Sequence, residues 1–109
     1  MTLILALMLV FQQFTYTAQE QITVAGTAIG FTAATINVGN GHAQANTATC
    51  RNETAQIRVT VDGTTPTSTV GTLVEIGDTF QVSSNNAMNL FRAIRTGGTS
   101  GKLTCNYSS

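Results

Sequence analysis

The stretch that decides the fold reads Gln56-Ile57-Arg58-Val59-Thr60-Val61-Asp62-Gly63. Its aliphatic residues alternate with polar ones, so an extended chain carries all three aliphatic side chains on one face. Such alternation is typical of a strand with one buried face, and the Asp-Gly pair that follows is a turn signal. We therefore predict a half-buried strand over 56–62. A loop should follow around Pro66, because proline lacks the backbone N–H that a sheet needs.

Outward from this stretch, Thr, Val and Ile recur in short runs that Gly and Asn interrupt, a pattern typical of many short strands. Apolar residues on both faces of the segment 89–95 predict a strand that is interior or covered by a neighbouring subunit. The fold class expected is all-β, a single β-sandwich, jelly-roll or Ig-like, of about seven or eight short antiparallel strands. The further strands are predicted at 22–25, 33–38, 48–51, 72–76, 79–82, 89–95 and 103–107, with turns at 39–41, 77–78 and 97–98.

The length of 109 residues suits one domain, which we place at 21–109 behind an apolar N-terminal arm, 1–20. The apolar run of the arm is half the length of a membrane-spanning helix, which needs about 20 residues, so we expect no membrane span. The run also lacks the preceding Lys or Arg of a secretory signal. A removed signal and a retained arm both stay open, and we predict a retained arm that makes assembly contacts. Its candidate contact residues are Leu3, Ile4, Leu5, Leu7, Leu9 and Phe11.

Charged residues make up only 9% of the chain, and the formal net charge is zero. Because affinity for phosphate rests mainly on clustered Lys and Arg, we expect no nucleic-acid partner. So little charge leaves a lone monomer poorly protected against association, so self-assembly or docking on a larger body is expected. Arg58, Arg92 and Arg95 lie on predicted strands, where they either bind carboxylates of a neighbouring subunit or face solvent.

Catalysis would need a nucleophile, a tuned base and an orienting group, or a metal cluster, and the sequence offers few candidates. The single histidine, His42, lies in a Gly-Asn-Gly loop, where we expect it to be solvated. We therefore predict no catalytic, cofactor-binding or metal-binding residue and no enzyme activity. Asn52-Glu53-Thr54 and Asn106-Tyr107-Ser108 match the acceptor pattern for N-glycosylation, although turn and strand-end residues are the simpler interpretation.

Two cysteines lie on predicted strands, each on an apolar face. Cys50 shares its face with Ala48, and Cys105 shares its face with Leu103 and Tyr107. A bond between them would close a loop of about 55 residues and stabilise the fold by about 4 kcal/mol on chain-entropy grounds. Two free buried thiols, the normal state in a reducing cytosol, are the alternative. Both interpretations stay open, and we predict the disulfide for the mature protein.

Much of the chain resembles a known family. The segments 26–34, 89–95, 99–101 and 103–107 look like that family's opening and closing strands. The most specific part is Thr54-Ala55-Gln56-Ile57-Arg58-Val59-Thr60-Val61-Asp62-Gly63-Thr64-Thr65-Pro66-Thr67-Ser68-Thr69-Val70-Gly71, followed by Ile76-Gly77-Asp78. Over residues 21–109 the chain thus resembles a family of small bacteriophage virion proteins. The apolar residues 1–20 and the cysteine pair are not part of the resemblance.

The resemblance implies a β-sandwich on a virus particle rather than an activity. We therefore expect a non-enzymatic virion structural protein, a capsid decoration or auxiliary subunit that covers or stabilises the particle. Its expected partners are copies of itself and other virion proteins, foremost the major capsid protein, and no cofactor. One alternative is a host-surface glycan-binding module, ranked second because Trp is absent and aromatic residues make up only 6%. The other is a secreted filament or adhesin subunit, which the arm would export.

Overall fold

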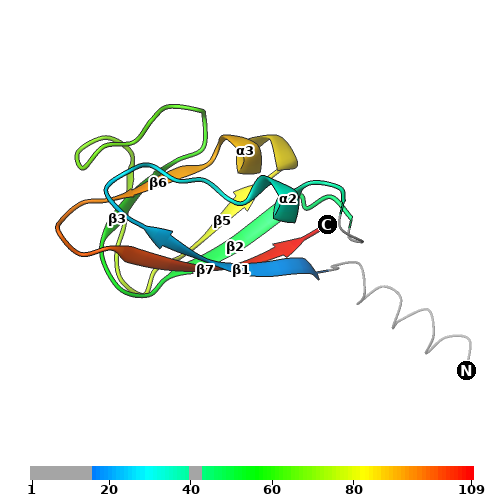
Figure 1. The fold of residues 1–109 in the computed structure, drawn as a ribbon, viewed down its shortest axis with the longest axis horizontal. Helices are drawn as coiled ribbons and strands as arrows, with labels where there is room; N and C mark the ends of the chain where they lie inside the picture. Colours follow the sequence, from blue (N-terminus) through cyan, green and yellow to red (C-terminus); the bar gives the residue numbers. More distant parts are fainter. Residues whose placement is uncertain (1–15, 40–42) are drawn as a thin grey trace, which may run out of the picture.

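The structure is a computed structural model that describes residues 16–39 and 43–109. The predicted arm contacts between Leu3 and Phe11, and His42, lie outside the described residues. Strands dominate the described chain, and its two helices are short (Figure 1). In chain order the elements are β1 Tyr16–Val24, α2 Ala33–Ile36, β2 Thr47–Asn52, β3 Ile57–Thr60, β4 Thr72–Val74, β5 Thr79–Ser83, α3 Asn85–Leu90, β6 Arg92–Arg95 and β7 Gly101–Ser108.

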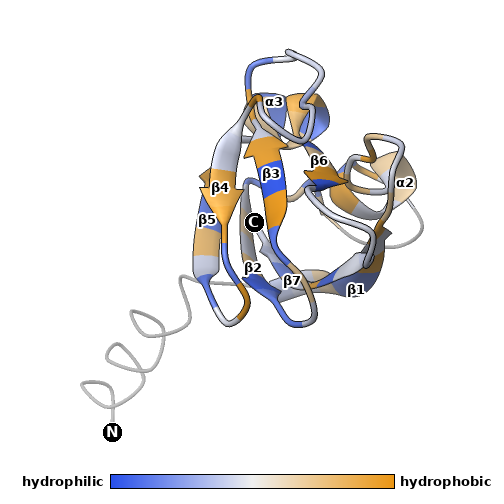
Figure 2. Cartoon of the chain, turned by 90° about the vertical axis from the view of Figure 1, so that its left-hand side faces the viewer, coloured by the Kyte–Doolittle hydropathy of each residue, from blue (hydrophilic) through white to orange (hydrophobic). Residues whose placement is uncertain are grey.

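The strands form two sheets in which every pairing is antiparallel. One sheet has four strands in the order β1-β7-β2-β5, and the other has three in the order β4-β3-β6. The two sheets lie face to face, with β4 beside β5 on one side of the molecule and β1 on the other (Figure 2). The predicted all-β sandwich is thereby confirmed, as is the half-buried strand at Ile57–Thr60, where Ile57 and Val59 face the core.

The pairing of the strands is that of a jelly roll. Between β1 and α2, Ile29 forms an antiparallel bridge with Ala93 of β6, and it stands where an additional strand would lie. β1 pairs with β7, the segment around Ile29 with β6, β2 with β5, and β3 with β4, so the pairs nest inward along the chain. Such nesting is the double Greek key of a jelly roll. Of the two predicted topologies, the strand order fits this one.

The core fills the space between the sheets and carries an aromatic cluster at one end. Phe31 stacks on Phe91 with ring centroids 4.1 Å apart and meets Tyr107 edge-on at 5.3 Å. Phe80 of β5 extends the stack, with its centroid 5.9 Å from that of Phe91. Offset and edge-to-face pairs of this kind contribute beyond their buried area. The cluster thus joins β5 and β7 of one sheet to the segment that leads into β6 of the other.

The predicted strand over 33–38 is wrong, because residues Ala33–Ile36 form helix α2. The carboxylate of Glu20 accepts hydrogen bonds from the N–H and the hydroxyl of Thr32, at 3.0 and 2.7 Å, and so holds the chain where the helix begins. Ile36 is buried on the inner side of the helix. Thr and Ile favour strands locally, but this contact with a distant carboxylate overrides that preference.

The predicted strand over 89–95 is correct only from Arg92, because Asn85–Leu90 form helix α3. The helix begins after Ser84, whose hydroxyl accepts a hydrogen bond from the N–H of Ala87 at 3.2 Å. Phe91 and Ala93 are fully buried within the chain itself. The chain's own core, and not a neighbouring subunit, therefore covers the buried face of this segment.

The first strand begins earlier than the sequence indicated. β1 starts at Tyr16, so residues 16–20 of the predicted arm pair with β7 in the sheet. Ala18 packs against the core, and a shift of register separates Tyr16 from Ala18. Removal of the N-terminal segment as a signal up to Ala18 would therefore take three residues from this strand.

Candidate functional site

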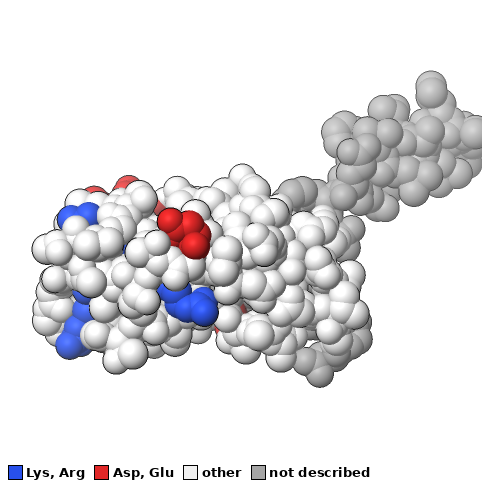
Figure 3. All heavy atoms as spheres, turned by 90° about the horizontal axis from the view of Figure 1, so that it is seen from above, with Lys and Arg blue, Asp and Glu red and all other residues white. Residues whose placement is uncertain are grey.

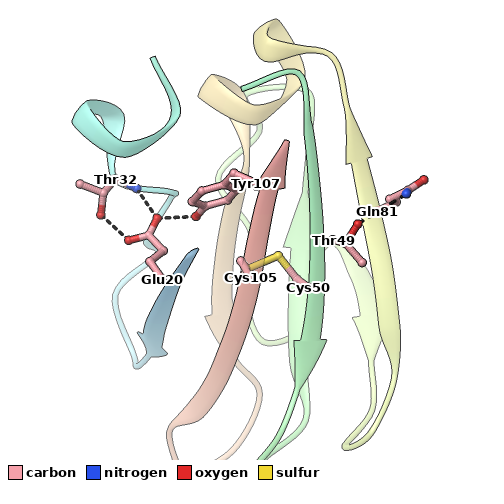
Figure 4. Close-up of a disulfide and its surroundings, with 7 residues drawn as sticks. All are labelled: Glu20, Thr32, Thr49, Cys50, Gln81, Cys105 and Tyr107. Carbon is pink, nitrogen blue, oxygen red and sulfur yellow. Dashed lines mark hydrogen bonds between the residues drawn. A yellow bond between two sulfur atoms is a disulfide. The ribbon is translucent and has the colours of Figure 1, made fainter. Parts of the chain in front are cut away.

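The carboxylate of Glu20 joins three elements of the fold. The Tyr107 hydroxyl donates a hydrogen bond to it, and Thr32 donates two more (Figure 4). Burial raises the pKa of the Tyr107 phenol far above its ordinary value, and the hydrogen bond to Glu20 and the negative charge of Glu20 raise it further. The phenol therefore stays protonated. Glu20 was not a predicted site residue, because the sequence analysis placed it in the arm.

The other acidic residues shape turns. Asp62 accepts a hydrogen bond from the backbone N–H of Thr64 at 3.0 Å, and this bond lowers the pKa of the exposed Asp62 carboxyl. Asp78 accepts one from the backbone of Glu75 at 2.9 Å, in the turn between β4 and β5. Both roles match the turns predicted from the Asp-Gly and Gly-Asp pairs. In the part of the chain that the structure describes, no group of three His, Cys, Asp or Glu residues could hold a metal ion.

The three predicted contact arginines all lie on the three-stranded sheet. Arg58 donates to the carbonyl oxygens of Ser68 and Gly71, at 3.0 and 2.8 Å, and so holds the loop between β3 and β4. Arg92 donates to two carbonyl oxygens near the end of α3, at 3.2 and 2.7 Å. Arg95 donates to a serine hydroxyl in the loop before β7, at 3.4 Å. Their pairing with carboxylates of a neighbouring subunit stays a prediction.

Cys50 and Cys105 form a disulfide, as predicted, and the alternative of two free thiols is wrong (Figure 4). The two residues lie directly opposite each other on β2 and β7, with their Cα atoms 4.1 Å apart. Both are fully buried. The bond therefore ties together the two central strands of the four-stranded sheet from its inner face.

The two possible glycosylation acceptors differ in accessibility. Asn52 is fully buried, and its amide group donates to the carbonyl oxygens of Ala55 and Val74, at 2.7 and 3.2 Å. This side chain therefore pins the end of β2 to the turn that follows and to β4. Asn106, in contrast, is exposed on the outer face of β7.

The outer face of the four-stranded sheet is polar. A row across all four strands consists of amide and hydroxyl side chains, with Gln19, Asn106, Thr49 and Gln81 as direct neighbours. Gln81 reaches Thr49 at 3.5 Å (Figure 4). Charge is sparse on the molecule, and the face seen in Figure 3 shows acidic and basic side chains as small separate groups within an uncharged surface.

A second amide cluster connects the two helices. The Asn85 amide donates to the Asn37 side chain at 3.1 Å and to the carbonyl oxygens of Ile36 and Ala45 at 3.2 and 3.0 Å. Asn89 donates to the side-chain oxygens of Asn37 and Asn85, at 3.2 and 2.9 Å. The helices thus lie side by side, as Figure 1 shows, and these amides are engaged within the fold. No pattern in the sequence pairs these asparagines.

On the side of the sandwich that carries β1 and β6, the chain itself covers the edge of β6, and we call this the sealed side. Ile29 exchanges two hydrogen bonds with Ala93 of β6, at 2.9 and 2.8 Å, and the Arg95 N–H donates to the carbonyl of Ala25 at 3.1 Å. The segment 25–31 therefore lies along the free edge of β6. On β1, the bulge near Tyr16 and the bonded carboxylate of Glu20 are features that protect edge strands.

The opposite side carries β4 and β5, and we call it the open side. Each strand pairs on one flank only, β4 with β3 and β5 with β2, and no described strand pairs with the other flank. Apolar side chains are exposed there and in the adjoining loop: Leu73 by 41%, Ile76 by 61%, and Val61 and Val70 by 46% each. Val59, Val61 and Val70 line a hollow of about 330 Å³ where β4 begins.

No protein-family model, curated protein or solved structure matches this chain. No helix among residues 16–39 and 43–109 is long and apolar enough to cross a membrane. The candidate site is therefore defined by the geometry alone, and it is the open side.

Proposed function

We propose that this chain is a non-enzymatic structural subunit of a bacteriophage-like particle, which covers or stabilises the particle through contacts with copies of itself and with the capsid protein. The observation that carries the proposal is the asymmetry of the sandwich. On one side the chain's own segment 25–31 covers the edge of β6, while on the other the edges of β4 and β5 have no such cover among the described residues, and exposed apolar side chains lie beside them. Unprotected strand edges can pair with a strand of another chain. Natural proteins therefore protect such edges unless a partner covers them.

The use of the charged residues supports a role without catalysis. Glu20, Asp62 and Asp78 accept hydrogen bonds that shape the fold, and the arginines donate to oxygens of their own chain. Hydrogen bonding of this kind orders loops and turns. A catalytic site would instead direct such groups together into a pocket.

The arm supports assembly. Its apolar residues would each gain about 1.5–3 kcal/mol on burial, so a segment of this composition needs a partner surface. The disulfide suits a protein that works in an oxidising setting, which includes the surface of a virus particle. Jelly rolls occur in viral capsid domains. This last argument is an analogy at the level of the fold, and it adds to the sequence resemblance without replacing it.

The polar face of the four-stranded sheet favours a second candidate, a module that binds host-surface glycan. Its rows of Gln, Asn and Thr offer the donors and acceptors that sugar hydroxyls need, and jelly rolls also occur in lectins. A glycan array with Gln81→Ala and Asn106→Ala as variants tests it. Binding that both variants weaken would favour this candidate over the structural role.

The proposed function is tested on gradient-purified particles of the virus that encodes this chain. Quantitative peptide mass spectrometry should find the chain in many copies per particle, and the purified protein should turn over no substrate in a panel of glycans and esters. Absence of the chain from purified particles would contradict the structural role. Turnover that Asp78→Asn abolishes would contradict the absence of catalysis.

A further inference from the structure

We propose that the open edge of β5 receives the apolar segment 3–11 of a second copy of this chain, which adds there as a strand. The inference deepens the proposed function, because it names the surface and the segment through which the subunits associate. It rests on three observations: the direction of the β5 backbone groups, the apolar surface beside them, and the reach of the N-terminal segment.

The backbone of β5 has free groups on its open flank. Hydrogen bonds at the two ends of the strand join Asn52 to Asp78 and Ser84 to Asn46, so the even-numbered residues face β2. The odd-numbered residues, such as Gln81, therefore direct their N–H and C=O groups to the open flank, since these groups alternate along a strand. The pairing of β2 with β5 has no bulge, and Thr79–Ser83 contain no charge and no proline. Nothing in β5 hinders strand addition.

The surface next to this edge is apolar enough to hold a strand. Ile76 is exposed in the turn that joins β4 to β5, and Leu73 is exposed on the outer face of β4. Figure 2 shows β4 and β5 next to each other on this side. The hollow lined by Val59, Val61 and Val70 adds a site for further aliphatic side chains. An occupant of this side must therefore offer both a free backbone and apolar side chains.

Residues 3–11 have this composition and this length. They are apolar without interruption, so the segment needs an apolar surface as well as a backbone to pair with. Nine extended residues reach about 30 Å, and the five residues of β5 span about 17 Å. The segment can therefore follow the whole of β5 and continue past its end.

We assign the donor to a second copy, because the linker within one chain is too short when the whole of segment 3–11 pairs. Tyr16, Ser108, Thr47 and Ser83 lie in one row, so β1 starts at the far edge from β5. A strand added outside β5 would lie four strand spacings, about 19 Å, from β1. The step from Phe11 to Tyr16 covers at most about 18 Å when fully extended. One side of each copy donates and the other accepts, so the contact is head to tail and builds rings or filaments.

The test uses two variants that each remove one half of the contact. Deletion of residues 2–14 removes the donor, and Gln81→Pro removes a backbone N–H from the acceptor edge, where edge strands tolerate proline. Gln81→Ala is the matched control, because it changes the same side chain and keeps the N–H. Far-UV circular dichroism and intact-mass detection of the disulfide establish that each variant folds.

Light scattering after size exclusion should find the full chain and Gln81→Ala as oligomers, and each of the two disrupted variants as a monomer. A mixture of the deletion and Gln81→Pro should restore a one-to-one dimer, because one copy still donates and the other still accepts. A monomeric mixture, or assembly of either variant alone, would overturn the proposal. A full chain that stays monomeric would also overturn it. So would a full chain that floats with phosphatidylcholine vesicles when the deletion variant does not. These outcomes leave the virion role itself to the particle analysis above.

Discussion

The two sides of the sandwich are built from the same kind of strand, but the chain's own described residues cover the edge of the sheet on one side only. On the sealed side, the segment 25–31 runs along β6, and Glu20 binds the Tyr107 hydroxyl and Thr32. On the open side, no described segment runs along the outer edge of β4 or β5. The sealed side therefore contributes stability, whereas the open side is available for a partner. The proposed assembly contact therefore lies at the edge of a sheet and not in a cleft.

The largest change in stability is expected from removing the disulfide, which joins the two central strands of the four-stranded sheet between the two sides. Replacing Cys50 and Cys105 by Ala should lower the free energy of unfolding by about 4 kcal/mol, because the bond closes a long loop in the unfolded chain. Urea denaturation measures the change, with the reduced native protein as a second comparison. Amide exchange should rise along both edges alike. A loss of amide protection confined to one side would show that the disulfide does not stabilise the two sides equally.

The next effect should fall on the sealed side. Glu20→Ala removes three hydrogen-bond acceptor contacts and leaves the buried Tyr107 hydroxyl without its partner, which should cost about 2–3 kcal/mol in urea denaturation. Glu75→Ala is the control on the open side, where an exposed Glu75 accepts from Gln56, and it should cost less than about 0.5 kcal/mol. Equal losses for the two variants would show that the sides do not differ as described.

The alkaline stability limit should also report on the sealed side. An unfolded tyrosine loses its proton near pH 10, whereas Tyr107 in the fold keeps its proton well above that value. Above about pH 10 the folded state then binds more protons than the unfolded state, so stability falls as pH rises, and it is unaffected at lower pH. Tyr107→Phe should flatten this alkaline decline in pH-dependent thermal melts. An unchanged decline would show that another group causes it.

The smallest change in stability is expected on the open side. Leu73→Ser alters an exposed side chain on β4 and should shift the free energy of unfolding by less than about 0.5 kcal/mol. Its neighbour Val74 faces the core, so Val74→Ser should cost about 2 kcal/mol. Thermal denaturation compares the two. A large loss for Leu73→Ser would mean that the open side is part of the fold's own support.

The sequence predicted those parts of the structure that depend on neighbouring residues. Alternation placed Ile57 and Val59 on the inner face of β3, and the Gly-Asp pair placed the turn between β4 and β5. The faces shared with Ala48, and with Leu103 and Tyr107, placed Cys50 and Cys105 in the core, and the predicted disulfide between them is confirmed. Local signals were sufficient because each of these features is decided within a few residues.

The errors and omissions came from long-range contacts. The turn into α2 depends on Glu20, which lies 12 residues before Thr32, and no local pattern indicates it. A serine before Asn85 was a usable start signal for α3, but the apolar run at 89–94 suggested a strand. The order of the strands, which decides which edges are sealed and which are open, depends on the whole topology and could not be read from any single segment.

The most direct test of the account is an image reconstruction of the intact particle, or of the assembled full-length protein, with this chain located in it. Residues 3–11 of one copy should run as a strand beside β5 of the next, while the sealed side should make no strand pairing with a neighbour. A reconstruction in which β5 faces solvent in every copy, or in which the chain begins after residue 15, would contradict it.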